Sequence, residues 1–375
     1  MKLLCLIDNL GSGGAQRQLV NLAILWKRKG HEVIFTCYGD ANFYESQLEE
    51  NEINIYRIKN KNILDRIIKI RKFIRKCNPD IVISFLLTPN LLACISSIGK
   101  HKWKLITSEL SANEKSFLGL RSKIYKWFER YSDWTVCNSY NAQQMWERYY
   151  PQFVHRISTI YNPVIMPQTQ TNTEKRQDGR RRIVVAASYQ GLKNPINVIE
   201  AVNKLSEAQQ KRLIIDWYGR KEVTTGNVEI AEQTERLVAQ YGLDACVHLN
   251  EATHEIYKEM CNADAVGLFS LYEGLPNAVC EGMMLGKPIL MTRMSDYARL
   301  VTKDNGFLCD AEDVQSIKGA LVSFLQASDE TLESMGRSSR ERAMELFAAD
   351  RIVEQWEALF EKLVSGKDGE MKNAD

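Results

Sequence analysis

Two carboxylates eight residues apart, Glu273 and Glu281, lie in the stretch Ser270-Leu-Tyr-Glu-Gly-Leu-Pro-Asn-Ala-Val-Cys-Glu-Gly-Met-Met-Leu-Gly-Lys-Pro288. Backbone N–H groups at the start of a helix attract phosphate, and a carboxylate one or two turns further on accepts hydrogen bonds from ribose hydroxyls. A glutamate in the loop before such a helix is then placed to meet a sugar. These residue types indicate a nucleotide-sugar site. The alternative, two ordinary solvated acids, is the better interpretation of a random glutamate pair, but the Gly-Leu-Pro and Gly-Lys-Pro flanks argue against it.

The elements that must position these carboxylates follow from the signals around them. Residues 263–270 are typical of a buried strand, Pro276 has the fixed φ favoured at a first helical position, and Gly286 marks a helix end. We therefore expect Glu281 inside a short helix and Glu273 in the loop before it.

The whole block resembles the Glu-x7-Glu signature of retaining glycosyltransferases with the GT-B architecture, in the large family 4 group. In that family the first glutamate contacts the transferred sugar and the second binds the nucleotide ribose. The resemblance implies these roles for Glu273 and Glu281. The donor would also meet the helix start, at Gly274, Leu275, Pro276 and Asn277.

Apolar strands alternate with amphipathic stretches on both sides of a polar segment, which predicts parallel α/β sheets with right-handed crossovers. The expected strands of the first half are Lys2–Ile7, Glu32–Cys37, Ile53–Arg57, Asp80–Phe85, Lys104–Thr107, Trp134–Cys137 and Arg156–Ile160. Those of the second half are Ile183–Ala187, Leu213–Tyr218, Ala245–Leu249, Ala265–Ser270 and Pro288–Met291, and the chain after Asp313 reads as helical.

This pattern predicts an α/β protein with two doubly wound, Rossmann-like domains. The domains expected are residues 1–165, which would bind the acceptor, and 183–349, which would bind the nucleotide sugar, joined by a linker over 166–182. The resemblance implies that the two domains face each other across a cleft and that a helix over 350–365 crosses back to the first domain. Residues 366–375 form a polar tail.

Two loops, each following the first expected strand of one half of the chain, supply further candidates. Gly13 and Gly14 sit in a glycine-rich loop that opens a helix, where a tight turn and a ligand site are equally good interpretations, and the family resemblance favours the site. Lys193 stands beside a helix start and matches the family's lysine for the diphosphate. Ser188 stands where the family has an arginine, so phosphate binding would rest on Lys193, on backbone amides or on a residue such as Arg220. An unpaired surface lysine is the alternative for Lys193.

Weaker candidates follow other strands. The resemblance implies that residues near His248 and Leu249 line the pocket for the base, although a packed strand residue is the simpler interpretation of His248. Glu109 comes just after a strand and is a candidate contact for sugar or acceptor, or an ordinary loop glutamate. The first-domain segments where the family often has a cleft histidine contain none.

Composition limits the function further. The 9 cysteines lack a Cys-x-x-Cys pair, several fall in expected buried strands, and no apolar run approaches the length of a membrane span, so we expect free thiols and a cytoplasmic protein. There is no nucleic-acid motif and no Asp-x-Asp, and we expect neither a nucleic-acid partner nor a metal or other cofactor.

Charge is unevenly distributed along the chain. Residues 1–165 hold 24 Lys and Arg against 14 Asp and Glu, whereas the rest holds 25 against 33. Nine of the basic residues and one Asp fall in Arg57–Lys76, among apolar residues at helical spacing. The stretch is either a helix packed on the sheet with solvated charges or one that also rests on an anionic membrane, with Trp103 and Arg121–Trp127 extending that surface.

Together these features predict an enzyme that transfers a sugar, with retention, from a nucleotide diphosphate sugar to a carbohydrate acceptor. The basic first half and the resemblance favour a lipid-linked oligosaccharide acceptor in bacterial surface polysaccharide assembly, at the inner face of the membrane. A non-catalytic GT-B-like scaffold and a nucleotide-sugar epimerase are the alternatives.

Overall fold

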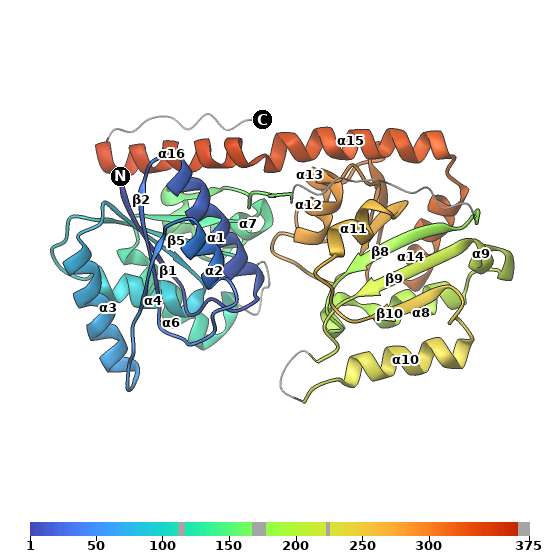
Figure 1. Cartoon of the computed structure of the whole chain (residues 1–375), viewed down its shortest axis with the longest axis horizontal. Helices are drawn as coiled ribbons and strands as arrows, with labels where there is room; N and C mark the ends of the chain where they lie inside the picture. Colours follow the sequence, from blue (N-terminus) through green and yellow to red (C-terminus); the bar gives the residue numbers. More distant parts are fainter. Residues whose placement is uncertain (112–116, 167–177, 223–225, 367–375) are drawn as a thin grey trace. The chain divides into compact units, whose positions relative to one another are not determined.

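The computed structural model describes residues 1–111, 117–166, 178–222 and 226–366. The chain divides into two compact units (Figure 1). Unit 1 comprises Met1–Ile165 and Phe347–Asp375, and unit 2 comprises Met166–Leu346. Most of the expected linker, residues 167–177, and nearly all of the expected tail lie outside the described residues.

Unit 1 is built on a parallel sheet, which has seven strands within the described residues, in the order β3-β2-β1-β4-β5-β6-β7. The strands are β1 (Lys2–Leu6), β2 (Glu32–Cys37), β3 (Asn54–Arg57), β4 (Ile81–Phe85), β5 (Lys104–Glu109), β6 (Trp134–Cys137) and β7 (Ile157–Thr159). The helices are α1 (Gly14–Arg28), α2 (Glu45–Glu50), α3 (Ile63–Cys77), α4 (Leu87–Ser96), α6 (Leu120–Phe128), α7 (Tyr140–Tyr149) and α16 (Ala349–Ser365), with single 3-10 segments at Glu129–Tyr131 and Pro151–Arg156.

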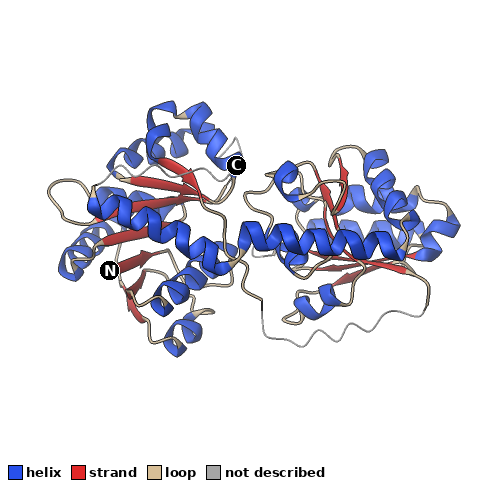
Figure 2. Cartoon of the chain, turned by 90° about the horizontal axis from the view of Figure 1, so that it is seen from above, coloured by secondary structure: helices blue, strands red, loops and turns tan. Residues whose placement is uncertain are grey.

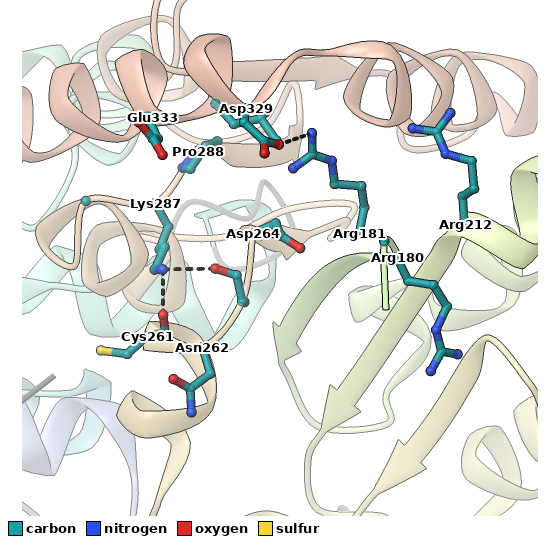
Figure 3. Close-up of a pocket in the computed structure, with 14 residues that line it drawn as sticks. Arg180, Arg181, Arg212, Cys261, Asn262, Asp264, Lys287, Pro288, Asp329 and Glu333 are labelled. Atoms are coloured by element: carbon teal, nitrogen blue, oxygen red, sulfur yellow. Dashed lines mark hydrogen bonds and ion pairs between the residues drawn. The ribbon is translucent and has the colours of Figure 1, made fainter. Parts of the chain in front are cut away.

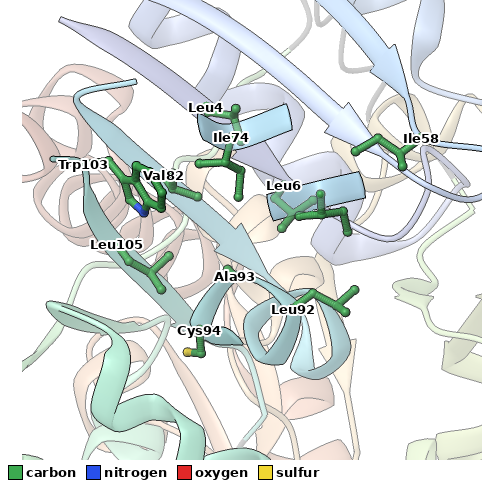
Figure 4. Packing of buried hydrophobic residues seen from close by; sticks show 11 residues of the cluster. Leu4, Leu6, Ile58, Ile74, Val82, Leu92, Ala93, Cys94, Trp103 and Leu105 are labelled. Carbon is green, nitrogen blue, oxygen red and sulfur yellow. The ribbon is translucent and has the colours of Figure 1, made fainter. Parts of the chain in front are cut away.

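A buried cluster holds α3 and α4 against this sheet (Figure 4). Strand residues Leu4, Val82 and Leu105 contact the inner faces of the two helices, to which Ile74 and Leu92 belong. The inner face of α3 is therefore core, because its apolar residues recur at helical spacing on the side that meets the strands.

The last helix, α16, packs on the first. The rings of Trp26 and Trp356 meet edge to face with centroids 5.4 Å apart, and Phe360 lies at the same distance from Trp26. His31 Nε2 lies 2.9 Å from Glu357 Oε1. The apolar stripe of the C-terminal helix is thus buried in unit 1 against α1, which is far from it in sequence.

Unit 2 contains a second parallel sheet, with six strands in the part of it that the structure describes, in the order β10-β9-β8-β11-β12-β13. The strands are β8 (Arg181–Ala186), β9 (Leu213–Tyr218), β10 (Val247–Asn250), β11 (Ala265–Leu268), β12 (Ile289–Thr292) and β13 (Gly306–Cys309). The helices are α8 (Pro195–Asn203), α9 (Glu207–Arg212), α10 (Glu229–Tyr241), α11 (Ile256–Cys261), α12 (Asn277–Met284), α13 (Tyr297–Leu300), α14 (Val314–Gln326) and α15 (Asp329–Phe347), with a 3-10 turn η3 at Gly191–Lys193.

Both units are doubly wound α/β folds, as predicted. Figure 2 shows helices on both faces of each sheet. In each sheet the strand order reverses once, between β1 and β4 in unit 1 and between β8 and β11 in unit 2. Loops at the carboxyl end of such a reversal diverge to opposite faces and leave a crevice, which is where open α/β sheets bind ligands.

The predicted strands all occur, with ends shifted by no more than two residues. One strand was missed, and two other expectations differ from the structure. Strand β13 was missed, because four residues at the edge of a sheet carry too little periodicity to recognise. Trp103 does not extend a surface: it is 4% exposed and belongs to the cluster under α3 and α4. Pro276 is the residue before α12 rather than its first residue.

All nine cysteines are free thiols, as expected, and burial raises the pKa of each of them. Among the described residues, no helix combines the length and the apolar content that a membrane crossing requires.

Candidate functional site

The loops that follow β8 and β11 meet at the carboxyl edge of the sheet in unit 2. The backbone N–H of Leu271 donates to the carbonyl oxygen of Leu192 over 2.8 Å, which joins the two loops directly. Because β8 and β11 are neighbours at the point of reversal, this contact brings together residues about eighty positions apart. It lies where the topology alone predicts a ligand.

Lys193 and Glu273, the residues expected to contact the diphosphate and the transferred sugar during catalysis, form an ion pair here. Lys193 Nζ bonds to Glu273 Oε1, and Ser270 Oγ donates to the same oxygen over 2.8 Å. The side chains are 20% and 16% exposed, so the pair is shielded but still open to solvent. The unpaired surface lysine considered for Lys193 is therefore the wrong interpretation.

The local sequence explains the position of Lys193. It ends the turn η3, and Asn194 then adopts a left-handed conformation with φ 65° before Pro195 opens α8. Asn tolerates this region better than most residues, and its side chain anchors the turn by donating to the carbonyl oxygen of Ala311 over 2.7 Å. The cation is thereby held two residues ahead of the first turn of α8.

A hydrogen bond from the loop after β12 fixes the loop that carries Glu273. Ser295, itself in a left-handed conformation with φ 54°, donates its hydroxyl to the carbonyl oxygen of Gly274. Leu275 is buried, and α12 then begins at Asn277. The candidates Gly274 to Asn277 thus form the entry to a helix that starts beside the ion pair.

Glu281 lies in the second turn of α12 and is 7% exposed. The next residue, Gly282, packs so tightly on β11 that a Cβ there would lie 2.8 to 3.0 Å from three carbons of Val266. Only glycine allows this approach of helix and strand, which determines where the neighbouring carboxylate lies. Its contact with a ribose stays a prediction.

Three residues outside the predicted site residues, Tyr189, Trp217 and Gly219, brace the carboxyl edge. The hydroxyl of Tyr189 lies 3.1 Å from the carbonyl oxygens of Trp217 and of Asn250, and Trp217 Nε1 donates to Ala187 over 2.6 Å. A Cβ on Gly219 would lie 1.9 Å from the carbonyl oxygen of Ala187. The glycine after the strand was the one available signal of this close approach.

Ser188, which replaces the family's arginine, lies in the same loop. Its Oγ accepts a hydrogen bond from Gln190 Nε2 over 2.9 Å. A serine brings no charge, so the predicted cations at this edge are Lys193 and Arg220. Arg220 follows β9 with an exposed side chain, and its carbonyl oxygen accepts a hydrogen bond from the backbone N–H of Tyr189 over 3.1 Å.

His248 takes part in a different cluster. Its Nδ1 lies 2.6 Å from Asp216 Oδ1, and the other oxygen of Asp216 accepts from Arg182 Nε over 2.5 Å. Arg182 also bonds to Glu259 over 2.6 Å.

His248 is the second residue of β10, so the carboxyl edge of that strand is formed by Asn250 instead. Leu249 points to the opposite face of the strand from His248, because side chains alternate. Contact of either residue with a base stays a prediction.

The candidates in unit 1 lie at the carboxyl edge of its own sheet. Gly13 precedes α1, and a Cβ there would lie 2.2 Å from Gln16 Oε1, whereas Gly14 is the first residue of the helix. Gln16 in turn donates to Asp8 over 3.0 Å. The neighbouring loop holds Leu86 at φ 79°, a conformation that strains any residue with a Cβ, and nothing in the sequence signalled this strain.

Glu109 ends β5 and is fully engaged. One carboxylate oxygen bonds to Lys126 and the other accepts from the backbone N–H of Ser111 over 3.1 Å. Lys126 is almost completely buried, with its ammonium 4.1 Å from the ring centroid of Phe117 and 4.2 Å from that of Trp146. This geometry is that of a structural ion pair, and acceptor contact by Glu109 remains a prediction.

A pocket of about 420 Å³ lies at the opposite, amino edge of the sheet in unit 2 (Figure 3). Its cations are already engaged: Arg181 bonds to Asp329 over 2.6 Å, and Lys287 Nζ donates to the carbonyl oxygens of Cys261 and Ala263. Burial lowers the pKa of Lys287. The pocket is thus lined by charges that serve the fold, and it does not include the Lys193–Glu273 pair.

Comparisons with known proteins agree with this geometry. The family model described as Glycosyltransferase Family 4 matches residues 12–166, and the one described as Glycosyl transferases group 1 matches residues 168–342. An α-1,4-N-acetyl-D-galactosaminyltransferase of Campylobacter jejuni, which acts on a GalNAc-GalNAc-diNAcBac chain linked to undecaprenol, is 25% identical over 95% of this chain and 97% of its own.

Solved structures show the same fold. The Anabaena protein HepE in complex with UDP and glucose superposes with a TM-score of 0.81 at 16% identity, over 96% of this chain and 99% of that one. The lipopolysaccharide outer core galactosyltransferase WaaB, in its apo form, gives a TM-score of 0.75 at 16% identity over 96% and 100%. With both halves matched by glycosyltransferase models and the fold shared along the whole chain, the protein belongs to the glycosyltransferases of the GT-B fold.

Proposed function

We propose that this glycosyltransferase takes a sugar from a UDP-sugar and transfers it, with retention at the anomeric carbon, to a carbohydrate chain carried on a lipid diphosphate. The observation that carries the proposal is the contact of Lys193 with Glu273 at the β8/β11 edge. Through this contact the Lys193 ammonium, which can bind a phosphate, lies within hydrogen-bond distance of the Glu273 carboxylate, which can accept hydrogen bonds from sugar hydroxyls.

Donor binding would replace this ion pair. A diphosphate carries more charge than a carboxylate, so Lys193 is expected to move from Glu273 to the leaving phosphate. The backbone N–H groups at the starts of α8 and α12 add partial positive charge on the same side. Glu273, released from Lys193, then accepts hydrogen bonds from the donor sugar, and Glu281 accepts them from the ribose.

The reaction follows from charge stabilisation. The bond between the anomeric carbon and the phosphate oxygen breaks, and Lys193 with the helix amides stabilises the departing nucleotide. The acceptor hydroxyl attacks from the same face and passes its proton to a leaving phosphate oxygen, so the configuration is kept. No side chain needs to act as a strong base in this scheme. Since Lys193 supplies the countercharge, we propose that no metal or other cofactor takes part.

The acceptor part of the proposal comes from relatives. The Campylobacter jejuni enzyme elongates an undecaprenol-linked glycan, and WaaB builds the lipopolysaccharide outer core. A lipid-linked glycan of bacterial surface polysaccharide assembly is the matching class here. We propose that the enzyme is cytoplasmic and that it meets this lipid-anchored acceptor at the inner face of the membrane.

Donor binding tests the proposal first. Melting temperatures would be compared with UDP, GDP and their sugar conjugates for the natural protein and for Glu281→Ala and Lys193→Ala, because a ligand of the native state raises the melting temperature. We expect a shift with UDP compounds that both variants reduce. Glu207→Ala and Lys211→Ala, at an exposed ion pair on α9, are the matched controls. No shift with any nucleotide at millimolar concentration would refute the donor site.

Product analysis tests the rest. An α-linked product from an α-configured UDP-sugar, shown by the anomeric proton coupling in NMR, would establish retention, and a β-linked product would disprove it. Interconversion of the free UDP-sugar without an acceptor would indicate an epimerase instead. Donor binding without turnover on any lipid-linked acceptor would indicate a scaffold.

A further inference from the structure

Apolar side chains gather on the outside of unit 1 where its core does not need them. Among the described residues, seven of the sixteen large apolar side chains that are exposed lie on or just before two helices, α3 and α6. We call this set the α3–α6 surface: Ile63, Leu64, Ile68, Leu118, Leu120, Ile124 and Trp127. Leu64 is 67% exposed and Leu120 is 78% exposed, which is unusual for leucines on helices that also have a buried face.

The two helices lie on the same side of the sheet. Both pack on α4, one on each flank (Figure 1). Both helices approach a common neighbour, Tyr38. The guanidinium of Arg66, in the first turn of α3, lies 4.2 Å from its ring centroid, and burial raises the pKa of Tyr38 with a further contribution from Tyr125, in the second turn of α6. Tyr38 follows β2. The exposed apolar residues therefore gather near the carboxyl edge of the sheet, the edge expected to bind the acceptor.

The inner faces of both helices are already satisfied. Ile70 and Ile74 of α3 are buried in the core cluster, and Phe128 at the end of α6 packs against the same cluster. The outer residues contribute nothing to this cluster. Their exposure is thus not a consequence of an incomplete fold.

Positive charge surrounds these side chains. Within Arg57–Lys76 the one acid is Asp65, and it is paired with Lys69 over 2.8 Å. Along Leu120–Tyr131 the exposed charges are Arg121, Lys123 and Arg130, while the acid Glu129 is buried. The guanidinium of Arg130 stacks 3.8 Å from the ring centroid of Trp127. An aromatic ring and aliphatic side chains flanked by long basic ones match the depth profile of a lipid interface, apolar inside and anionic at the headgroups.

We propose that the α3–α6 surface docks unit 1 onto an anionic lipid bilayer, with its aliphatic residues and Trp127 in the interface and its Lys and Arg at the headgroups. Charge complementarity selects a membrane over a protein partner, because acids that would pair with a specific protein surface are missing from the exposed positions of α3 and α6 apart from Asp65. Docking would bring the carboxyl edge of the unit 1 sheet near the lipid that carries the acceptor. That last consequence rests on the proposed function, whereas lipid binding does not.

Flotation of the full chain with vesicles tests the proposal. Vesicles of phosphatidylcholine with about 30% phosphatidylglycerol would be compared with pure phosphatidylcholine, at about 0.1 M salt. We expect binding to the anionic vesicles and at least about tenfold weaker binding to the neutral ones, with a blue shift of tryptophan fluorescence on binding. Equal binding to both, or none, would overturn the proposal.

Matched variants distinguish vesicle binding by this surface from nonspecific binding of the protein to vesicles. Leu64→Gln with Leu120→Gln should weaken vesicle binding at least about tenfold, and Lys72→Gln with Lys123→Gln should weaken it to a similar degree. The controls are Val364→Gln and Lys211→Gln, which are exposed elsewhere. Controls that lose binding equally, or surface variants that keep it, would refute the assignment, as would capture of a specific protein in its place.

The readouts distinguish two kinds of failure. All of these positions are exposed, so melting temperatures should not change, and the UDP-dependent shift should persist in each variant. If the surface variants lose vesicle binding and keep donor binding, the α3–α6 surface acts in membrane docking and not in donor binding. Absence of a donor shift with vesicle binding intact would refute the proposed function and leave the membrane surface standing.

Discussion

Each unit places a lysine–glutamate pair at the carboxyl edge of its sheet, and the two pairs differ in what surrounds the lysine. In unit 2, Lys193 is 20% exposed and reaches Glu273 beside the hydroxyl of Ser270. In unit 1, Lys126 is 2% exposed and reaches Glu109 between two aromatic rings. A lysine that solvent reaches can exchange its partner for a phosphate, whereas a lysine enclosed by rings cannot leave without exposing a cavity. We therefore expect the same pair of residue types to form a ligand site in unit 2 and a structural link in unit 1.

The largest effect that this comparison predicts is on turnover. Lys193→Ala and Glu273→Ala should each lower kcat/KM by about 100- to 1,000-fold, because each removes a charge that acts on the donor. Steady-state transfer from the UDP-sugar is the measurement. Residual activity above one tenth of the natural protein in both variants would mean that the exposed pair is not the catalytic one.

Removal of the buried pair should act on stability instead. Glu109→Gln leaves Lys126 buried without a countercharge and should lower the free energy of unfolding by about 2 to 4 kcal/mol. Glu273→Gln should change it by less than about 1 kcal/mol, since Lys193 can be hydrated. Urea denaturation of both variants gives the comparison. The donor-induced shift should survive in Glu109→Gln, and its loss there would show that the unit 1 pair takes part in binding.

The buried pair has a neighbour that makes unit 1 sensitive to pH. Burial raises the pKa of Glu129 to about 7, although Thr107 donates to it over 2.6 Å. The folded state therefore holds this proton at pH values where the unfolded state has released it, and stability should fall as the pH rises from about 4.5 to about 7. Glu129→Gln should remove this contribution and so gain up to about 3 kcal/mol at pH 8 relative to the natural protein. Urea denaturation at pH 5 and pH 8 measures the effect, with Glu207→Gln as the exposed control.

Packing under the donor site gives a smaller effect. Gly282→Ala would push a methyl group against Val266 and move α12 away from β11, at a cost of about 1 to 3 kcal/mol in stability. Because Glu281 is carried by the same helix, donor affinity should fall as well. Gly319→Ala, on α14 with open space around it, is the matched control. An unchanged UDP-sugar Kd in Gly282→Ala would show that the position of α12 does not set the position of Glu281 in the complex.

The smallest expected effect is that of a chelator. If Lys193 supplies the countercharge for the diphosphate, EDTA should leave the initial rate of transfer unchanged. A rate that falls with EDTA and returns with Mg²⁺ or Mn²⁺ would show that a metal ion shares this role. The comparison of the two lysines would then no longer account for catalysis.

The sequence by itself determined every strand except β13 and the fold class, because alternation of apolar strands with amphipathic helices leaves a parallel α/β fold as the solution that buries both. It also picked out Lys193 and Glu273, because charges and turn residues next to strand ends are visible locally and because both residues match the motifs of the family that the chain resembles. Their contact could not be read, because it depends on β8 and β11 becoming neighbours, and strand order is a property of the whole sheet.

Tertiary structure alone decided which residues of similar type do different work. Burial separates Lys126 from Lys193 and hides Trp103, whereas exposure leaves Leu64 and Leu120 on the surface of helices whose other faces are core. The physical reason is that the free energy of a charge or an apolar side chain depends on its surroundings, which are assembled from residues distant in the chain. Composition and spacing specify the groups, and the packing of the sheets specifies which of them water or a ligand can reach.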